Sequence, residues 1–370
     1  MVRLESMPEW DREYLTSLPC PSFETDPWAE GPPLAERRIA IVSTAGLQRR
    51  DEPPFKVGAT DYRVIPGDVE ADDLVMSHIS VNFDRSGFQQ DLNVVFPIDR
   101  LNELAAVGVL AHYLEEEGLP TAGLSLVRLH SEKIRPPRAL WVPYELGRPL
   151  GVPGDGAFQR RVLEAVLSLF EEVSGPVLKD YHEDVPEEAN ASEEGMACTV
   201  SFPSSDSDDG GTAEALLMEI GQLQQWHQLA VERAGRTTVG ASRLEMETIA
   251  RFIGAVTDGE AVENPRPDLQ RGETLKLACD DLRAFYTESV VIQPGQQHLT
   301  SEALSEWFWN GTAAGKAFWA LRDVCIASKD EIMRTFGIYI LVPRSQLKGT
   351  GGAEDWAAAS AEDALKETLS

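Results

Sequence analysis

The sequence has few cysteines and no long apolar run, and each shortage excludes a class of protein. Its four cysteines lie far apart in a chain of 370 residues, so no CxxC pair or zinc-ligand spacing occurs and no disulfide framework is expected. No stretch approaches the ~18 apolar residues of a membrane-spanning helix. The first residues lack the basic patch and apolar block of a signal peptide. We therefore expect a soluble, cytoplasmic protein.

Cations are also scarce. The chain has 33 Lys and Arg residues against 61 Asp and Glu residues, which gives a net charge of −28. Nucleic-acid binding depends on cations that release condensed counterions, and anionic membrane surfaces attract basic segments. The composition therefore predicts neither nucleic acid nor membrane as a partner, and the sequence indicates no metal and no cofactor.

Lys and Arg are absent from residues 181–214, where carboxylates, Gly, Ser and Pro dominate. Such a self-repelling stretch predicts a flexible linker, with an acidic interaction segment as the alternative. The predicted organisation is an N-terminal arm (1–36), an α/β domain (37–180), the acidic linker (181–213), a helical bundle (214–347) and a mobile tail (348–370).

Strand-like and helix-like segments alternate before the linker, which predicts an α/β domain with a mostly parallel, Rossmann-like sheet. The predicted strands are residues 38–44, 62–65, 74–79, 121–129 and 138–144. The predicted helices are residues 10–18, 98–106, 111–117 and 157–173.

After the linker, apolar residues recur at three- and four-residue spacing, which predicts an all-α C-terminal domain. The predicted helices are residues 213–234, 242–257, 271–286, 301–327 and 330–341. Cys279 and Cys325 lie on apolar faces of these helices and are predicted to belong to the core.

Several segments of the first half resemble one known family. They are VSTAGL (42–47), TDYRVIP (60–66), SHISVNFDRSGFQQDLNVVFPIDRLNEL (77–104), RPPRALWVPYELGRPLG (135–151) and SGPVLKDY (174–181). Together they resemble the selenoprotein B family of the glycine, sarcosine and betaine reductases and of D-proline reductase, over nearly half of the chain.

The resemblance implies an oxidoreductase that cleaves a C–N bond. In that family a selenolate or thiolate attacks a small amine substrate, which a pyruvoyl group on a partner subunit activates. A small-molecule substrate and a protein partner subunit are therefore implied for this chain.

The segment that carries the nucleophile in the family is missing here. Residues 105–110 run directly into residues 111–126, which resemble the helix and strand that follow the family motif, and no cysteine lies between Cys20 and Cys198. Three hypotheses stay open: a reductase that uses Cys20 or a partner's thiol, a catalytically silent binding or scaffold protein whose helical domain docks a partner, and a truncated domain.

A polar segment at the densest part of the resemblance provides the first candidate site. His78 is a candidate general base, and Asp84, Arg85 and Asp91 are candidate substrate-binding residues. The alternative is a structural hydrogen-bond network in which these side chains satisfy backbone groups.

Further candidates lie near strand ends. Ser43, Thr44 and Gly46 follow a predicted strand, where an α/β sheet presents backbone N–H groups to ligands, although such residues also form simple turns. Asp61 and Arg63 share one face of a predicted strand and are candidate substrate contacts, with a surface pair as the alternative.

Cys20 is the candidate thiol of the first half. It lies between two prolines in the N-terminal arm, where nothing local supplies the cations that lower a thiol pKa, so a structural cysteine is the alternative. Cys198 falls in the linker and is interpreted as an incidental exposed thiol.

Overall fold

The computed structural model describes residues 9–18, 20, 23–33, 36, 39–56, 58–104, 118–185, 211–294, 296 and 299–347. The chain divides into two compact units, and each is built from two stretches of sequence. Unit 1 comprises Met1–Ala45 and Phe83–Ala189, and unit 2 comprises Gly46–Asn82 and Asn190–Ser370. The segment Gly46–Asn82 therefore packs in the unit of the helices that follow it far along the chain, whereas the sequence predicted it within residues 37–180.

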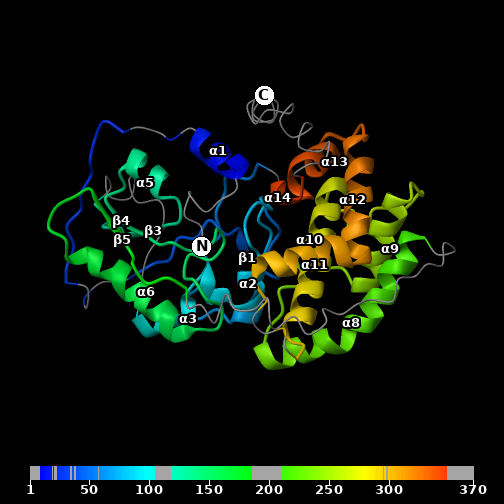
Figure 1. Ribbon diagram of the computed structural model, residues 1–370, viewed down its shortest axis with the longest axis horizontal. Helices are drawn as coiled ribbons and strands as arrows, with labels where there is room; N and C mark the ends of the chain where they lie inside the picture. Colours follow the sequence, from blue (N-terminus) through cyan, green and yellow to red (C-terminus); the bar gives the residue numbers. More distant parts are fainter. Residues whose placement is uncertain are drawn as a thin grey trace. The chain divides into compact units, whose positions relative to one another are not determined.

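Unit 1 contains a small parallel sheet of three strands in the order β3-β4-β5 (Figure 1). β3 (Gly123–Ser125) pairs with β4 (Arg138–Trp141), and β4 pairs with β5 (Val177–Asp180). Parallel strands need crossover connections, and α5 (Arg128–Ile134) and α6 (Gly156–Ser168) lie in the two connections. This mixed arrangement confirms the parallel sheet with helices, and three short strands do not by themselves show a Rossmann-like layout.

The core of unit 1 forms between α6 and the strand β4. Phe158, Val162 and Val166 recur at helical spacing on one face of α6 and are fully buried against Leu140 and Val142. Asp155 caps the helix, since its side chain accepts a hydrogen bond from the Phe158 amide at 2.9 Å. This packing fixes the sheet from one face.

The other α-helices within the described part of unit 1 are short. They are α1 (Glu9–Ser17), α2 (Ser86–Gln90) and α3 (Ile98–Leu104). α3 confirms the predicted helix 98–106 as far as Leu104.

Unit 2 combines a two-stranded antiparallel ribbon with a group of helices. β1 (Leu47–Arg49) pairs with β2 (Leu74–Met76). The helices are α8 (Thr212–Ala234), α9 (Met246–Thr257), α10 (Arg271–Val291), α11 (Ser301–Gly311), α12 (Ala313–Ile326), α13 (Glu331–Thr335) and α14 (Arg344–Leu347), with a π-helical turn at Phe336–Ile340. α10 is the central helix, because it packs against α8, α9, α12 and α13 and buries side chains all round its circumference.

The predicted helix 301–327 is wrong as a single element, because Thr312 divides it. The Thr312 hydroxyl donates to the Phe308 carbonyl at 2.7 Å and accepts from the Gly315 amide at 2.9 Å. One side chain thus closes α11 and caps α12. A threonine inside an apolar period is a weak sequence signal, since Thr also occurs within helices.

Two predicted strands are also wrong. Residues 39–44 form no strand, although Ile39 and Ile41 pack against the core of unit 1. Residues 62–65 form no strand either, and Tyr62 and Val64 are exposed. In both segments the β-branched and aromatic residues, which favour strands, have no neighbouring strand to pair with. Strand propensity alone does not produce a strand without such pairing.

Other predictions differ in their bounds. The predicted strands 74–79, 121–129 and 138–144 shorten to β2, β3 and β4, while α5 begins inside the second of them. The helices predicted at 10–18, 157–173, 213–234, 242–257, 271–286 and 330–341 are confirmed with shifted ends. The predicted helix 111–117, the tail 348–370 and linker residues 186–210, which include Cys198, lie outside the described residues.

Two helical glycines provide a matched test of this packing. A Cβ on Gly315 would meet the Phe308 carbonyl and the Trp309 backbone, whereas Gly221 in α8 has nothing within 4 Å. Gly315→Ala should therefore lower the free energy of unfolding by about 1–3 kcal/mol. Gly221→Ala should raise it by about 0.5–1 kcal/mol, because Ala favours a helix over Gly. Urea denaturation measures both, and equal effects would contradict the packing described for α12.

Candidate functional site

In unit 1, the side chain of Asp84 organises the polar turn that precedes α2. It accepts hydrogen bonds from the Ser86 and Gly87 amides, both at 3.0 Å, and from the Ser86 hydroxyl at 2.6 Å. Arg148 pairs with the same carboxylate at 2.5 Å, and both side chains are largely buried. The carboxylate caps the short helix and ties it to the loop that follows β4.

Asp91 forms a second polar centre in the same unit. One of its oxygens accepts from the Asn93 amide at 2.9 Å, and the other accepts from the Gly154 amide at 2.8 Å and Gln159 Nε2 at 2.6 Å. Arg85 is buried, with its guanidinium carbon 5.6 Å from the centroid of the Phe83 ring. These contacts hold loops together, and a substrate-binding role for Asp84, Arg85 and Asp91 stays a prediction.

The candidates at the end of the first predicted strand fall in different units: Ser43 and Thr44 belong to unit 1, and Gly46 belongs to unit 2. The Ser43 hydroxyl donates to the Val95 carbonyl at 3.1 Å, and Thr44 is exposed. Gly46 belongs to unit 2 and adopts a φ of +65°, where a Cβ would lie 2.9 Å from His78 Cα. Gly46 is therefore required for the close approach of two backbone segments.

His78 and the Asp61–Arg63 pair also belong to unit 2. His78 Nδ1 accepts a hydrogen bond from the Ser80 amide at 3.0 Å, which in a neutral ring places the proton on Nε2. Arg63 pairs with Asp61 and lies 4.4 Å from the centroid of the Phe55 ring. The candidate residues thus fall into two groups: His78, Gly46, Asp61 and Arg63 in unit 2, and the rest in unit 1.

The described cysteines are not placed as reactive thiols. Burial raises the pKa of Cys325 to about 12 and raises that of Cys279 well above its ordinary value. Their predicted place in the core is confirmed. Cys20 is half-buried, and its Sγ donates to the Leu18 carbonyl at 3.8 Å, a partner that offers a thiolate no stabilisation.

The densest polar site of unit 2 is a loop between α8 and α9 that sequence reasoning missed. We call residues 236–243 the anchored loop. Asp281 of α10 is fully buried and accepts hydrogen bonds from the Gly240, Ala241 and Ser242 amides, each at 2.9 Å, and from the Ser242 hydroxyl at 2.5 Å. Burial raises the pKa of Asp281 to about 6, and these four hydrogen bonds oppose that rise.

Glu288 anchors the start of the same loop. It lies seven residues after Asp281 on α10, so both carboxylates project from one side of the helix. It accepts from the Thr238 amide at 2.7 Å, from the Thr237 hydroxyl at 2.6 Å and from His227 Nε2 at 3.0 Å. Burial would raise the pKa of Glu288, but the bonds from His227, Thr237 and Thr238 outweigh it and lower the pKa.

The Thr237–His227–Glu288 arrangement is not that of a hydrolytic triad. In a triad the acid binds one ring nitrogen of the histidine, and the nucleophile binds the other. Here the Thr237 hydroxyl lies 3.4 Å from His227 Nε2, the same nitrogen that contacts Glu288. The cluster therefore serves to hold the loop, and the geometry does not activate Thr237.

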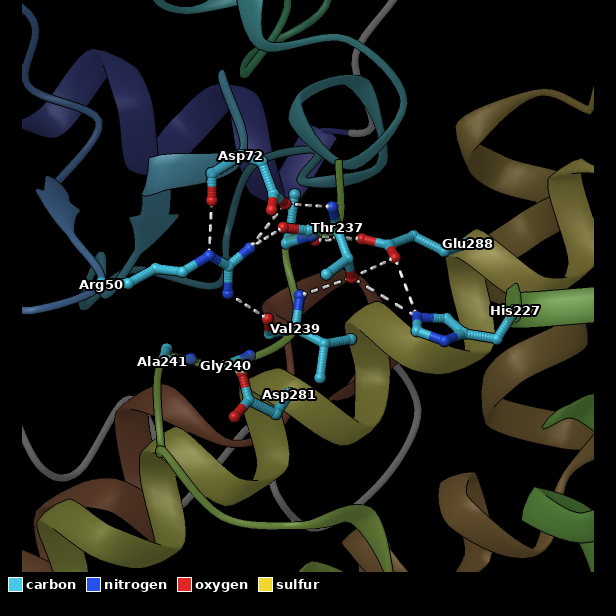
Figure 2. Close-up of polar contacts among 10 residues, drawn as sticks. Arg50, Asp72, His227, Thr237, Val239, Gly240, Ala241, Asp281 and Glu288 are labelled. Carbon is cyan, nitrogen blue, oxygen red and sulfur yellow. Dashed lines mark hydrogen bonds and ion pairs between the residues drawn. The ribbon is translucent and has the colours of Figure 1, made fainter. Parts of the chain in front are cut away.

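Arg50, which directly follows β1, hydrogen-bonds to the anchored loop (Figure 2). Its guanidinium donates to the Val239 carbonyl at 2.6 Å and to the Thr237 carbonyl, while its Nε donates to the Asp72 carbonyl at 2.5 Å. Asp72 also accepts from the Thr237 amide at 2.9 Å. The loop thus connects the early segment of unit 2 to its central helix.

A sequence signal for this site did exist. Asp281 and Glu288 interrupt the apolar face of the predicted helix 271–286 and its continuation, and buried carboxylates require partners. Asp281, however, binds mostly backbone amides of a loop some forty residues earlier, and Glu288 binds one amide and two hydroxyls of that loop together with His227. Side-chain patterns in the sequence do not indicate such partners.

Comparison with known proteins gives a partial similarity to one reductase subunit. D-proline reductase subunit gamma of Acetoanaerobium sticklandii is 33% identical over 78 residues, which cover 21% of this chain and 31% of that protein. The matched part is thus less than a third of the relative's length. No family model and no solved structure matches. The similarity supports a distant reductase-family relationship and no finer assignment. Among the described helices, none is long and apolar enough to cross a membrane.

Replacement of Asp281 by asparagine tests the anchored loop. In Asp281→Asn one acceptor oxygen becomes an NH₂ group that faces N–H donors, so buried donors lose their partner. The free energy of unfolding should fall by about 2–4 kcal/mol. Asp323→Asn, at a side chain that is 81% exposed, is the control and should change it by less than about 0.5 kcal/mol. Urea denaturation would contradict the anchor if both variants matched the wild type.

The pH dependence of stability tests the ionisation of Asp281. Its folded pKa of about 6 lies above the ordinary value of 3.8, so the folded chain takes up this proton first as the pH falls. The group should therefore stabilise the fold progressively on acidification from about pH 7 to pH 4, by up to roughly 1.4 kcal/mol per unit between the two pKa values. The stability difference between the wild type and Asp281→Asn, followed by denaturation over this range, should grow in favour of the wild type. A constant difference would count against the raised pKa.

Proposed function

We propose that this chain is a component of a reductive, C–N-cleaving system of the selenoprotein B type and that a partner subunit supplies its reactive thiol or selenol. The substrate in this proposal is a small amine. Asp84, Arg85 and Asp91 of unit 1 are the residues proposed to bind it. In this proposal unit 1 descends from a larger, Rossmann-like α/β domain.

The observation that carries the proposal is the state of the cysteines. A nucleophilic thiolate needs a lowered pKa, which nearby cations or a helix N-terminus provide. Burial instead raises the pKa of Cys279 and of Cys325, and the Cys20 thiol donates to a backbone carbonyl. The sequence resemblance supports the reductive chemistry, and the absence of a cysteine between Cys20 and Cys198 supports a thiol from elsewhere.

The reaction needs two electrons and two protons. Two thiols, or a thiol and a selenol, become a disulfide or selenenyl sulfide while the C–N bond breaks and a C–H and an N–H bond form. Burial raises the pKa of Cys279 and of Cys325, so the proposal takes both sulfur or selenium atoms from the partner. The name of the similar protein, a reductase subunit gamma, fits an assembly of several chains.

Alkylation kinetics test the proposal on the full chain. With iodoacetamide at neutral pH, Cys20, Cys279 and Cys325 should react no faster than free cysteine, because burial raises the pKa of Cys279 and Cys325 and the Cys20 thiol donates to a backbone carbonyl. Mass spectrometry of the labelled peptides assigns each rate to its residue.

The contrary outcome is well defined. A cysteine that reacts at least about tenfold faster than free cysteine, with the fast phase lost in Cys20→Ser and kept in Cys198→Ser, would identify Cys20 as an activated nucleophile. The chain would then carry its own thiol, and the dependence on a partner's thiol would be wrong.

A further inference from the structure

Helix α8 of unit 2 has two stripes of side chains on opposite sides. It packs against α9, α10 and α12, and its buried apolar stripe consists of Leu216, Ile220, Leu223 and Ala230. We call the second stripe the outer stripe, and it consists of Met218, Gln222, Gln225 and Leu229. The residues of the outer stripe follow one another at spacings of four, three and four, so they lie along one side of the helix, turned away from the buried stripe.

The outer stripe is open to solvent over most of its length. Met218 is 50% exposed, Gln222 and Gln225 are exposed, and Leu229 is half-buried. Interface cores are enriched in methionine and depleted of charged residues. The stripe shows both features.

Charged side chains are absent from the exposed part of α8 between its two ends. From Glu214 to Glu232 the sequence contains one other Asp, Glu, Lys or Arg, which is Glu219. Glu219 is buried, and its carboxylate accepts hydrogen bonds from the Ala313 amide at 2.8 Å and the Tyr286 hydroxyl at 2.7 Å. Charged residues make up 25% of the chain and concentrate on protein surfaces, so an uncharged outer side is unusual for this molecule.

The outer stripe is complementary to itself. It has the same order in both directions, which is an apolar residue, two glutamines and an apolar residue. Two antiparallel copies of α8, related by a two-fold axis between residues 223 and 224, would bring Met218 opposite Leu229 and Gln222 opposite Gln225. A glutamine amide has both donors and an acceptor and can therefore bind another glutamine, whereas a carboxylate or an ammonium group cannot bind its own copy.

We propose that the outer stripe of α8 joins two copies of this chain in an antiparallel dimer. The occupant is a second copy because the stripe matches itself and is uncharged, whereas the net charge of −28 makes copies repel where charged surfaces face each other. One helix from each copy gives an interface below the standard size, so the dimer forms at micromolar concentrations. This inference does not depend on the proposed function.

Sedimentation equilibrium of the full chain tests the dimer. Up to about 200 µM chain, the data should fit a monomer–dimer equilibrium. Because the copies repel and the stripe has no ion pairs to screen, the Kd should fall about threefold or more between about 50 and 300 mM NaCl. A chain that stays monomeric overturns the proposal, and so does a Kd that is unchanged or rises with salt.

Variants of exposed glutamines locate the contact without disturbing the core. Gln225→Glu brings two carboxylates together near the two-fold axis and should raise the Kd about tenfold or more. The matched control is Gln224→Glu, which adds the same charge to the neighbouring exposed residue but points about 100° away around the helix. The control should leave the Kd within about twofold of the wild type.

A double variant tests the antiparallel pairing. In Gln222→Lys with Gln225→Glu, each lysine faces a glutamate of the other copy, so the Kd should return to within about threefold of the wild type. The proposal is overturned if Gln225→Glu dimerises like the wild type, if Gln224→Glu weakens the dimer equally, or if the double variant does not restore it. Cysteine alkylation does not report on this contact, so the two proposals fail separately.

Discussion

Two buried carboxylates on α10 hold unit 2 together, and the rest of that unit depends on them. Asp281 and Glu288 bind the anchored loop mainly through backbone amides and threonine or serine hydroxyls, and Arg50 binds two carbonyls of the same loop. Val75, Ala241 and Leu277 then form a small core that joins the β1–β2 ribbon, the loop and the central helix. An unpaired charge at either position would be costly, so the hydrogen bonds and this core have to form together.

The helical part of the fold was predictable from sequence because each helix carries its own signal. An apolar stripe at 3.6-residue spacing marks α8 and α9 without knowledge of any partner. The prediction is wrong where a side chain ends a helix although the apolar spacing continues. The Thr312 hydroxyl, for example, closes α11 and caps α12.

The strands and the polar sites were less predictable because their determinants are distant in sequence. Ile39 and Ile41 are partly buried against the core of unit 1, yet they pair with no strand. β5 was not predicted, since Gly175 and Pro176 precede it and its ladder partner β4 is distant in sequence. The polar residues of the candidate site were identified as a network, but their division between two units follows from long-range contacts alone.

The path of the chain between the units has a consequence for biosynthesis. The sequence passes from unit 1 to unit 2 after Ala45, returns after Asn82 and passes back after Ala189. During translation, Gly46–Asn82 emerges well before α8 and α10 exist, so Arg50 and Asp72 then have no anchored loop to bind. Exposed Tyr62 and Val64 would meet chaperones and neighbouring chains in that interval. Because unit 1 is also interrupted, neither unit corresponds to one continuous fragment that could be expressed alone.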